Sequence, residues 1–99
     1  MPYNIGYARY VVSSAAIGLK TAPAAGGTLP ANVKTALIQN VDPANTINWS
    51  DDVNNPPTAT EGMQLAPGQS LVFDGEFADF KMIRAGSADV TSIRISYYA

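Results

Sequence analysis

Short apolar runs separated by turn-forming residues are the feature that most constrains how this chain can fold. In the run 91–98, Thr91, Ile93, Ile95 and Tyr97 occupy every second position and share one face. Successive side chains of a strand point to opposite faces of a sheet, so this alternation predicts a strand with one buried face. Residues 20–32 contain two Pro and a Gly-Gly pair, which indicate a loop that no helix crosses.

Six other segments carry a strand signal. They are residues 9–19, 33–41, 46–50, 80–86 and the two halves of 62–75. Pro67 and Gly68 divide that last segment and suit the centre of a type II turn, because Gly takes a positive φ at little cost. Alternation places Val11, Ala15, Ile17 and Leu19 on one face of 9–19, and Val33, Leu37 and Val41 on one face of 33–41. The sequence therefore predicts an all-β fold: an antiparallel β-sandwich, jelly-roll or Greek-key-like, with about seven short strands and little or no helix.

The length and composition predict one small domain with an unusual surface. A chain of 99 residues fits a single core. We expect the sandwich at residues 9–99 and a separate N-terminal arm at residues 1–8, because MPYNIGYARY holds three Tyr beside a Pro and a Gly and looks too irregular for a strand. Such an arm either folds back onto its own sandwich or lies on a neighbouring molecule. Only 14% of the residues are charged, which suits a surface partly covered by other copies or by a partner.

The composition also argues against several classes of function. The chain has no Cys and no His, which removes thiolate chemistry, the commonest general base and the commonest transition-metal ligand. Its net charge of −2 argues against binding nucleic acid through the phosphates. No apolar run approaches the ~20 residues that span a bilayer, and the N-terminal residues lack the pattern of a secretory signal. We therefore expect neither a nucleic-acid nor a membrane partner, and synthesis in the cytoplasm.

The adjacent carboxylates Asp51 and Asp52 are the only pair that suggests chemistry. The segment DDVNN lacks the alternating oxygen positions and the Gly of a calcium loop. Neighbouring side chains on a strand point to opposite faces, so the two residues also make a poor glycosidase pair. Asp and Asn commonly start turns by bonding to their own backbone. We expect no catalytic residue, no cofactor and no metal site, and hence no enzyme.

The aromatic residues allow two interpretations. Trp49, Tyr97 and Tyr98 could form a platform on which a sugar stacks. Alternatively, Trp49 shares a face with Ile47 and anchors the core beside Phe73 and Phe80, which is the arrangement we expect. The candidates for contact with a partner are Tyr3, Tyr7, Tyr10 and Tyr98.

The order of these segments resembles that of small proteins encoded among the virion genes of tailed bacteriophages. The matching positions are Trp49, Asp51, Asp52, Pro57, Thr58, Ala59, Gly62, Leu65, Gly68, Phe80, Ile83, Arg84, Ala85, Tyr97 and Tyr98. The resemblance covers about residues 9–99. The chain departs from the group at residues 53–56, where a Gly usually follows the acidic pair, so the turn is longer here.

This resemblance implies a virion structural protein, and we expect a head decoration or cement protein at the capsid surface. The implied partners are the major capsid protein and other copies of the chain, as a homo-oligomer on the virion. Two alternatives remain open: a component of the neck or tail, and a glycan- or receptor-binding module of the virion, which an exposed Trp49 would favour.

Overall fold

The computed structural model describes residues 3–19, 30 and 32–99. These residues form eight strands and one turn of 3-10 helix, so the fold is all-β, as predicted, with one strand more than expected. The elements are β1 (Asn4–Val12), β2 (Ile17–Gly18), β3 (Thr35–Asn40), β4 (Ile47–Ser50), β5 (Met63–Leu65), β6 (Ser70–Phe73), η1 (Phe77–Asp79), β7 (Lys81–Arg84) and β8 (Val90–Tyr98). No helix among these residues is long and apolar enough to cross a membrane.

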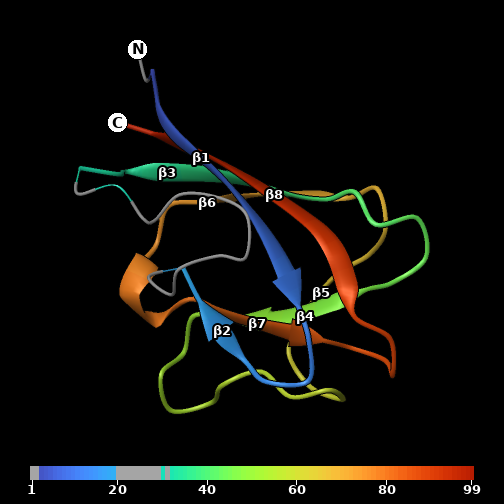
Figure 1. Cartoon of the computed structure of the whole chain (residues 1–99). Helices are drawn as coiled ribbons and strands as arrows, with labels where there is room; N and C mark the ends of the chain where they lie inside the picture. The colour runs from blue at the N-terminus through green and yellow to red at the C-terminus, as the bar shows by residue number, and fades with distance from the viewer. Residues whose placement is uncertain (1–2, 20–29, 31) are drawn as a thin grey trace.

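The strands build two antiparallel sheets of four strands each (Figure 1). Sheet A has the order β1-β8-β3-β6, and sheet B has the order β2-β7-β4-β5. Along the chain, β1 pairs with β8, β2 with β7, β3 with β6 and β4 with β5. Because these four pairs alternate between the sheets, the chain is a long double ribbon wrapped into a sandwich, which is the topology of an eight-stranded jelly roll. The predicted β-sandwich is confirmed.

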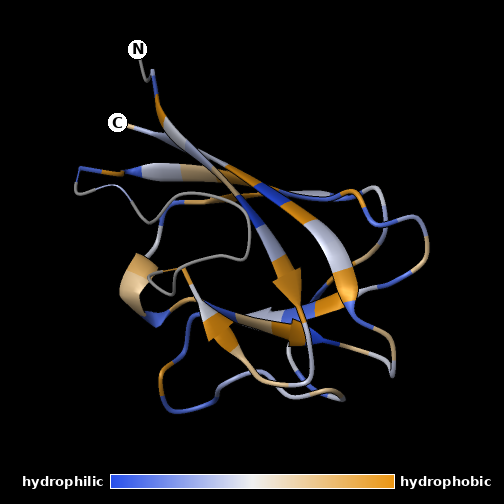
Figure 2. Cartoon of the chain, viewed as in Figure 1, coloured by the Kyte–Doolittle hydropathy of each residue, from blue (hydrophilic) through white to orange (hydrophobic). Residues whose placement is uncertain are grey.

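The core lies between the two sheets and takes side chains from both. Ile93, Ile95 and Tyr97 of β8 are inaccessible to solvent, as predicted, but Thr91 is exposed because the pairing shifts register between Val90 and Ile93. Ile47 and Met82 of sheet B belong to the same apolar cluster. Figure 2 shows the resulting bands of apolar and polar residues along the longer strands. Burying one side chain of this size contributes about 1.5–3 kcal/mol, so this cluster dominates the stability of the domain.

The turn between β5 and β6 has the predicted geometry. The Gln69 N–H donates to the Ala66 carbonyl at 3.0 Å, and Gly68 has a φ of 83°. These are the bond and the dihedral angle of a type II turn. The Gly68 N–H also donates to the Asn40 carbonyl at 2.8 Å, which ties the turn to the end of β3.

The separate arm expected at residues 1–8 is wrong for residues 4–8. Asn4–Val12 is one strand, whose pairing with β8 runs from Asn4 opposite Tyr98 to Val12 opposite Val90. Figure 1 shows β1 beside β8 along the sheet. The pairing shifts register between Asn4 and Gly6 and again near Tyr10, and such bulges absorb the irregular spacing that argued against a strand.

The face predicted for residues 9–19 is also wrong. Tyr10 and Val12 are buried, whereas Val11 points outward and is 38% exposed. Three consecutive apolar residues fit either phase of an alternating pattern, so the sequence does not settle which face is buried. The segment is not one strand: β1 ends at Val12, and β2 begins at Ile17 in the other sheet.

The sequence places Val33, Leu37 and Val41 on one face of residues 33–41. In the structure, the opposite face of this strand is the buried one. Ala36, Ile38 and Asn40 are buried in sheet A, and Leu37 points outward. Burial of Asn40 is possible because its side-chain amide donates to the carbonyls of Asn45 and Leu65, at 2.8 and 2.9 Å. Burying a side-chain amide costs little free energy when its N–H groups are hydrogen-bonded. The alternation of apolar and polar residues in the sequence does not reveal such hydrogen bonds.

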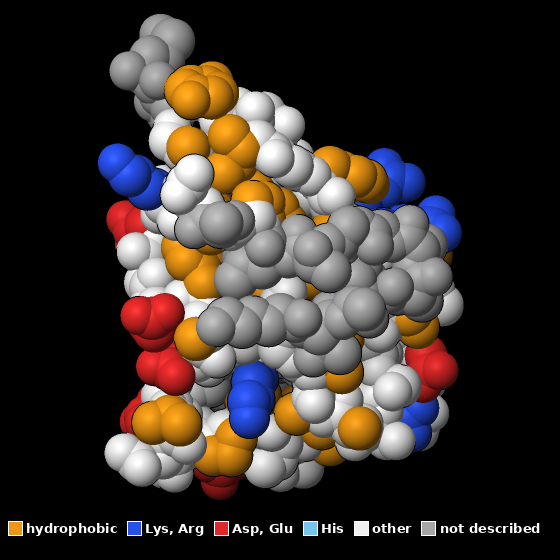
Figure 3. Space-filling view, turned by 60° about the vertical axis from the view of Figure 1, so that its left-hand side comes forward, with side chains coloured by type: hydrophobic (Ala, Val, Ile, Leu, Met, Phe, Trp, Pro, Cys, Tyr) orange, Lys and Arg blue, Asp and Glu red, His pale blue; other side chains and the backbone are white. Residues whose placement is uncertain are grey.

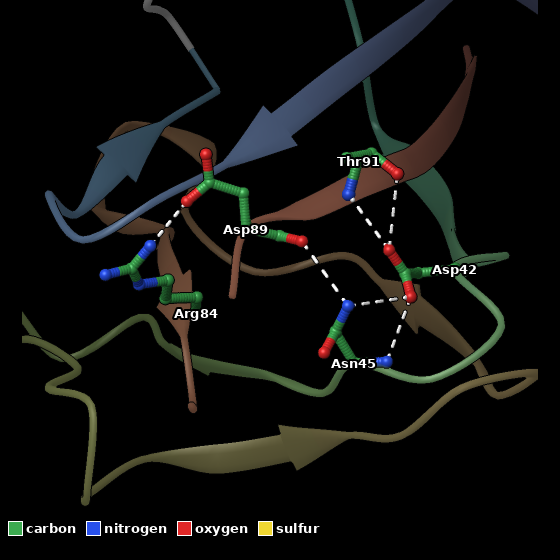
Figure 4. Close-up of polar contacts among 5 residues, drawn as sticks. All are labelled: Asp42, Asn45, Arg84, Asp89 and Thr91. Atoms are coloured by element: carbon green, nitrogen blue, oxygen red, sulfur yellow. Dashed lines mark hydrogen bonds and ion pairs between the residues drawn. The ribbon is translucent and has the colours of Figure 1, made fainter. Parts of the chain in front are cut away.

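A buried carboxylate organises the loops at one end of the sandwich (Figure 4). Asp42 accepts hydrogen bonds from the backbone N–H groups of Ala44 and Asn45 and from both the N–H and the hydroxyl of Thr91. These donors, the Ala44 N–H foremost, lower the pKa of Asp42. The network continues from Asn45 to the Asp89 carbonyl, and Asp89 forms an ion pair with Arg84. Asp42 therefore connects the loop after β3 to the start of β8.

Candidate functional site

Three apolar side chains lie in one row on the outward side of sheet A. The row runs from Tyr7 on β1 through Ser96 on β8 and Leu37 on β3 to Val72 on β6, so Ser96 is its one polar member. Tyr7 is 53% exposed and Val72 is 66% exposed. Single exposed apolar residues are ordinary on a protein surface, but a row that spans a whole sheet is typical of an interaction surface. We call the outward side of β1, β8, β3 and β6 the sheet A face.

The sheet A face is basic as well as apolar. Arg9 lies directly opposite Arg94, in the row next to the one that contains Tyr7. All eight acidic residues of the chain lie outside the strands. Figure 3 shows many of the Asp and Glu side chains along one side of the molecule. Arg9 and Arg94 are therefore the basic side chains of the sheet A face, Lys81 and Arg84 lie on β7 of sheet B, and the acidic side chains lie in the loops and in η1.

The four Tyr residues proposed for partner contact have different positions. Tyr3 and Tyr7 are exposed, and Tyr98 is half-buried on the outward side of β8. Tyr10 is 1% exposed, so its assignment as a contact residue is wrong. Its side chain points inward from β1, where its hydroxyl donates to the Leu19 carbonyl at 2.9 Å. A Tyr buried in this way needs a partner for its hydroxyl, and Leu19 supplies one.

A groove of about 440 Å³ lies beside Trp49, between the end of β4 and the loop at residues 51–62. Its apolar lining comes from Trp49, Pro56, Gly62 and Met63. Its polar lining comes from Ser50, Asp52, Asn54, Asn55, Thr58 and Glu61. The volume falls within the range of ~300–1,000 Å³ that is usual for small-molecule sites. Among the residues that the structure describes, no Lys or Arg lines this groove.

Trp49 belongs both to the core and to this groove. Its ring stacks on Phe80, with centroids 5.4 Å apart and planes 23° apart, and it meets Phe73 edge-on at 6.1 Å. The expected packing with Phe73 and Phe80 is therefore confirmed. The expected full burial is not, because Trp49 is half-buried and lines the groove. Tyr97 and Tyr98 lie on β8 in the other sheet, so the three residues do not form one platform.

Internal hydrogen bonds hold the loop at residues 51–62. The Asp52 carboxylate accepts from the Asn55 side-chain amide at 2.8 Å and from the Asn54 N–H at 3.0 Å. These bonds, the one from Asn55 first, lower the pKa of Asp52. On the other side of the loop, the Asn48 side-chain amide donates to the Thr58 carbonyl at 2.9 Å. Asp52 thus starts a turn, as the spacing of DDVNN indicates.

The carboxylates do not gather into a centre with several ligands. Within residues 3–19, 30 and 32–99, no group of three or more acidic side chains could hold a metal ion. Asp52 uses both of its oxygens in the turn. The sheet A face and the Trp49 groove both have the form of a binding site.

Comparisons with protein-family models, with curated proteins and with solved structures found no match for this chain.

Proposed function

We propose that this chain is a non-enzymatic structural protein of a bacteriophage virion, a capsid decoration or cement protein that binds the major capsid protein through the sheet A face. The observation that carries the proposal is the exposed apolar row from Tyr7 to Val72 beside the arginine pair. The virion role is proposed because the order of motifs in residues 9–99 resembles that of phage virion proteins. Jelly rolls are common among viral capsid domains, so the fold agrees with this role, although a fold alone does not identify a function.

The charge of the sheet A face favours an acidic partner. Arg9 and Arg94 lie opposite one another, whereas the only ion pair among the described residues joins Arg84 to Asp89. A second copy docked face to face would bring the same arginines together, so this face does not suit a symmetric dimer. An acidic, partly apolar patch on a capsid subunit complements it. Other copies of the chain would then occupy neighbouring positions on the shell.

An interface centred on the sheet A face reaches the size of a specific interface by extending onto the surrounding loops, because four strands about 4.8 Å apart span only about 20 Å. The molecule measures 38 × 30 × 22 Å. Its broadest side is therefore on the order of 1,000 Å², and a standard interface buries about 800 Å² per partner. Docking that uses most of one face reaches this area. Repetition over the many equivalent sites of a shell multiplies the effect of a moderate contact.

The proposal is tested by deleting the gene from the phage that carries it and comparing purified particles. We expect mass spectrometry and immunogold labelling to find the protein on the head, and heads without it to release DNA at a lower temperature. Label confined to the neck or tail would favour that alternative position. Particles that never contain the protein would contradict a virion role.

Surface variants separate docking from folding. Replacing Tyr7 and Val72 together by Ser removes the two most exposed members of the row and should abolish binding to shells prepared without the protein. Both side chains are exposed, so the melting temperature should change little. Val53→Ser is the matched control, because Val53 is 67% exposed but lies in the loop after β4.

A further inference from the structure

We propose that the groove beside Trp49 binds a neutral saccharide, which stacks on the exposed part of the indole and bonds to the polar side chains of the loop at residues 51–62. Trp49 lines the groove while its ring is held against Phe80 and Phe73. A ring fixed on two sides is a rigid platform, and stacking on it costs little conformational entropy. The proposal is independent of any position on a virion.

The polar lining selects the chemistry of the ligand. Asn54 and Asn55 offer amide groups that both donate and accept, and Glu61 offers a carboxylate that accepts. A sugar presents several hydroxyl groups, each of which is both a donor and an acceptor, together with apolar C–H faces. With Asp52 and Glu61 in its wall, the groove repels phosphates and other anions. A neutral polyhydroxylated ring satisfies all these groups at once.

The loop that carries these side chains is organised before any ligand binds. The Thr58 N–H donates to the Glu61 carbonyl at 2.8 Å, and the Glu61 N–H donates to the Thr58 hydroxyl at 3.0 Å. The side-chain amide of Asn48, which is 2% exposed, donates a hydrogen bond to the Thr58 carbonyl and so holds this part of the loop against β4. Ordering a loop during binding lowers affinity, so a loop with these bonds in place is suited to a small polar ligand.

Tryptophan fluorescence offers a direct test, because Trp49 is the only Trp of the chain. The probes are neutral hexasaccharides of glucose, of mannose and of N-acetylglucosamine. We expect at least one of them to shift the emission of Trp49 saturably, with a dissociation constant of about 0.1–1 mM, the range of a shallow site with a few hydrogen bonds. No shift with any hexasaccharide up to about 10 mM would overturn the proposal. A response to Ca²⁺ alone would also overturn it.

Two variants locate the binding. Asn54→Ala removes an amide group and Glu61→Ala removes a carboxylate acceptor, and each should weaken binding about tenfold, as the loss of one hydrogen bond to a charged or amide group does. Val53→Ser is the control in the same loop, because Val53 is exposed and does not line the groove. Equal affinity in all three variants and the wild type would place the sugar elsewhere and contradict the assignment. Unchanged melting temperatures would show that each variant is folded.

Discussion

Two tyrosines that look alike in the sequence have opposite roles at the level of single residues. Tyr7 and Tyr10 both belong to β1, but Tyr7 is on the sheet A face and Tyr10 is in the core. Burial raises the pKa of Tyr10, and its hydroxyl lies 3.5 Å from that of Tyr97. The hydroxyl of Tyr10 therefore links β1 both to β8 and to the Leu19 carbonyl.

Tyr10→Phe should lower the free energy of unfolding by about 1–2 kcal/mol. The substitution keeps the ring but leaves the buried Leu19 carbonyl without its donor, and an unmet buried acceptor carries a cost of that size. Chemical denaturation measures the effect. Tyr7→Phe is the matched control and should leave stability unchanged, because Tyr7 is 53% exposed. Equal effects of the two substitutions would contradict the core role of Tyr10.

Asp42 should make the stability of the protein depend on pH in the acid range. Its pKa is lowered by the N–H donors of Ala44, Thr91 and Asn45, so the folded state binds a proton less readily than the unfolded chain. The stabilisation is complete above the unfolded pKa of about 4, and it is lost as the pH falls through the lowered folded pKa. Thermal melts of Asp42→Asn should therefore differ most from the wild type near neutral pH. A difference that stays constant down to acid pH would contradict this.

At the scale of elements, the loop at residues 51–62 depends on one backbone position. Gly62 has a φ of 139°, and a Cβ there would lie 3.1 Å from both the Asn48 Cβ and the Trp49 carbonyl oxygen. Gly62→Ala should therefore lower stability by about 1–3 kcal/mol and distort the groove. Gly86→Ala is the control, because nothing lies within 4 Å of its Cβ position. Differential scanning calorimetry compares the two; an equally small effect at Gly62 would show that the loop can adjust.

The pairing of β1 with β8 predicts that residues 1–8 are needed for folding. Their deletion removes Asn4–Ala8 from the sheet and uncovers the edge of β8 beside Ile95 and Tyr97. We expect a loss of about 2–4 kcal/mol, or about 10–25 °C in melting temperature for a domain of this size. Tyr3→Ser should leave the melting temperature unchanged, because Tyr3 is 68% exposed. A truncated chain as stable as the wild type would mean that this half of β1 contributes little.

The sequence predicts some elements better than others, for physical reasons. The buried face of β8 is predicted correctly from Ile93 to Tyr97, where the residues alternate regularly, but not at Thr91, where a register shift interrupts the alternation. In β3, the burial of Asn40 depends on the carbonyls of Asn45 in the following loop and of Leu65 at the end of β5, and the alternation of apolar residues does not contain that information. The Trp49 groove is hard to predict for the same reason. The sequence places Trp49 in the core, and the polar wall beside it forms only when the loop at residues 51–62 folds next to β4.

At the scale of the whole molecule, the separation of charge matters more than its sum. The net charge is only −2, yet Arg9 and Arg94 lie on the sheet A face while the acidic residues lie in the loops and in η1. No acidic side chain lies on the strands of the sheet A face, so the local field of Arg9 and Arg94 attracts an acidic partner to this face. Exposed charges are screened within about 10 Å at 0.1 M salt, so this attraction weakens as salt is added.

Binding to capsid shells should accordingly depend on both charge and salt. Arg9→Glu places a negative charge against the acidic patch proposed on the shell, and we expect binding to weaken at least about tenfold, because like charges across an interface are strongly unfavourable. Lys81→Glu makes the same change of net charge on β7 of sheet B and should bind as the wild type does. Co-sedimentation with shells at about 50 and 500 mM NaCl measures both effects, with the wild type binding more tightly at the lower concentration. If both variants lose binding equally, net charge and not the sheet A face governs the interaction. If Arg9→Glu binds as well as the wild type at low salt, the shell contacts another side of the molecule.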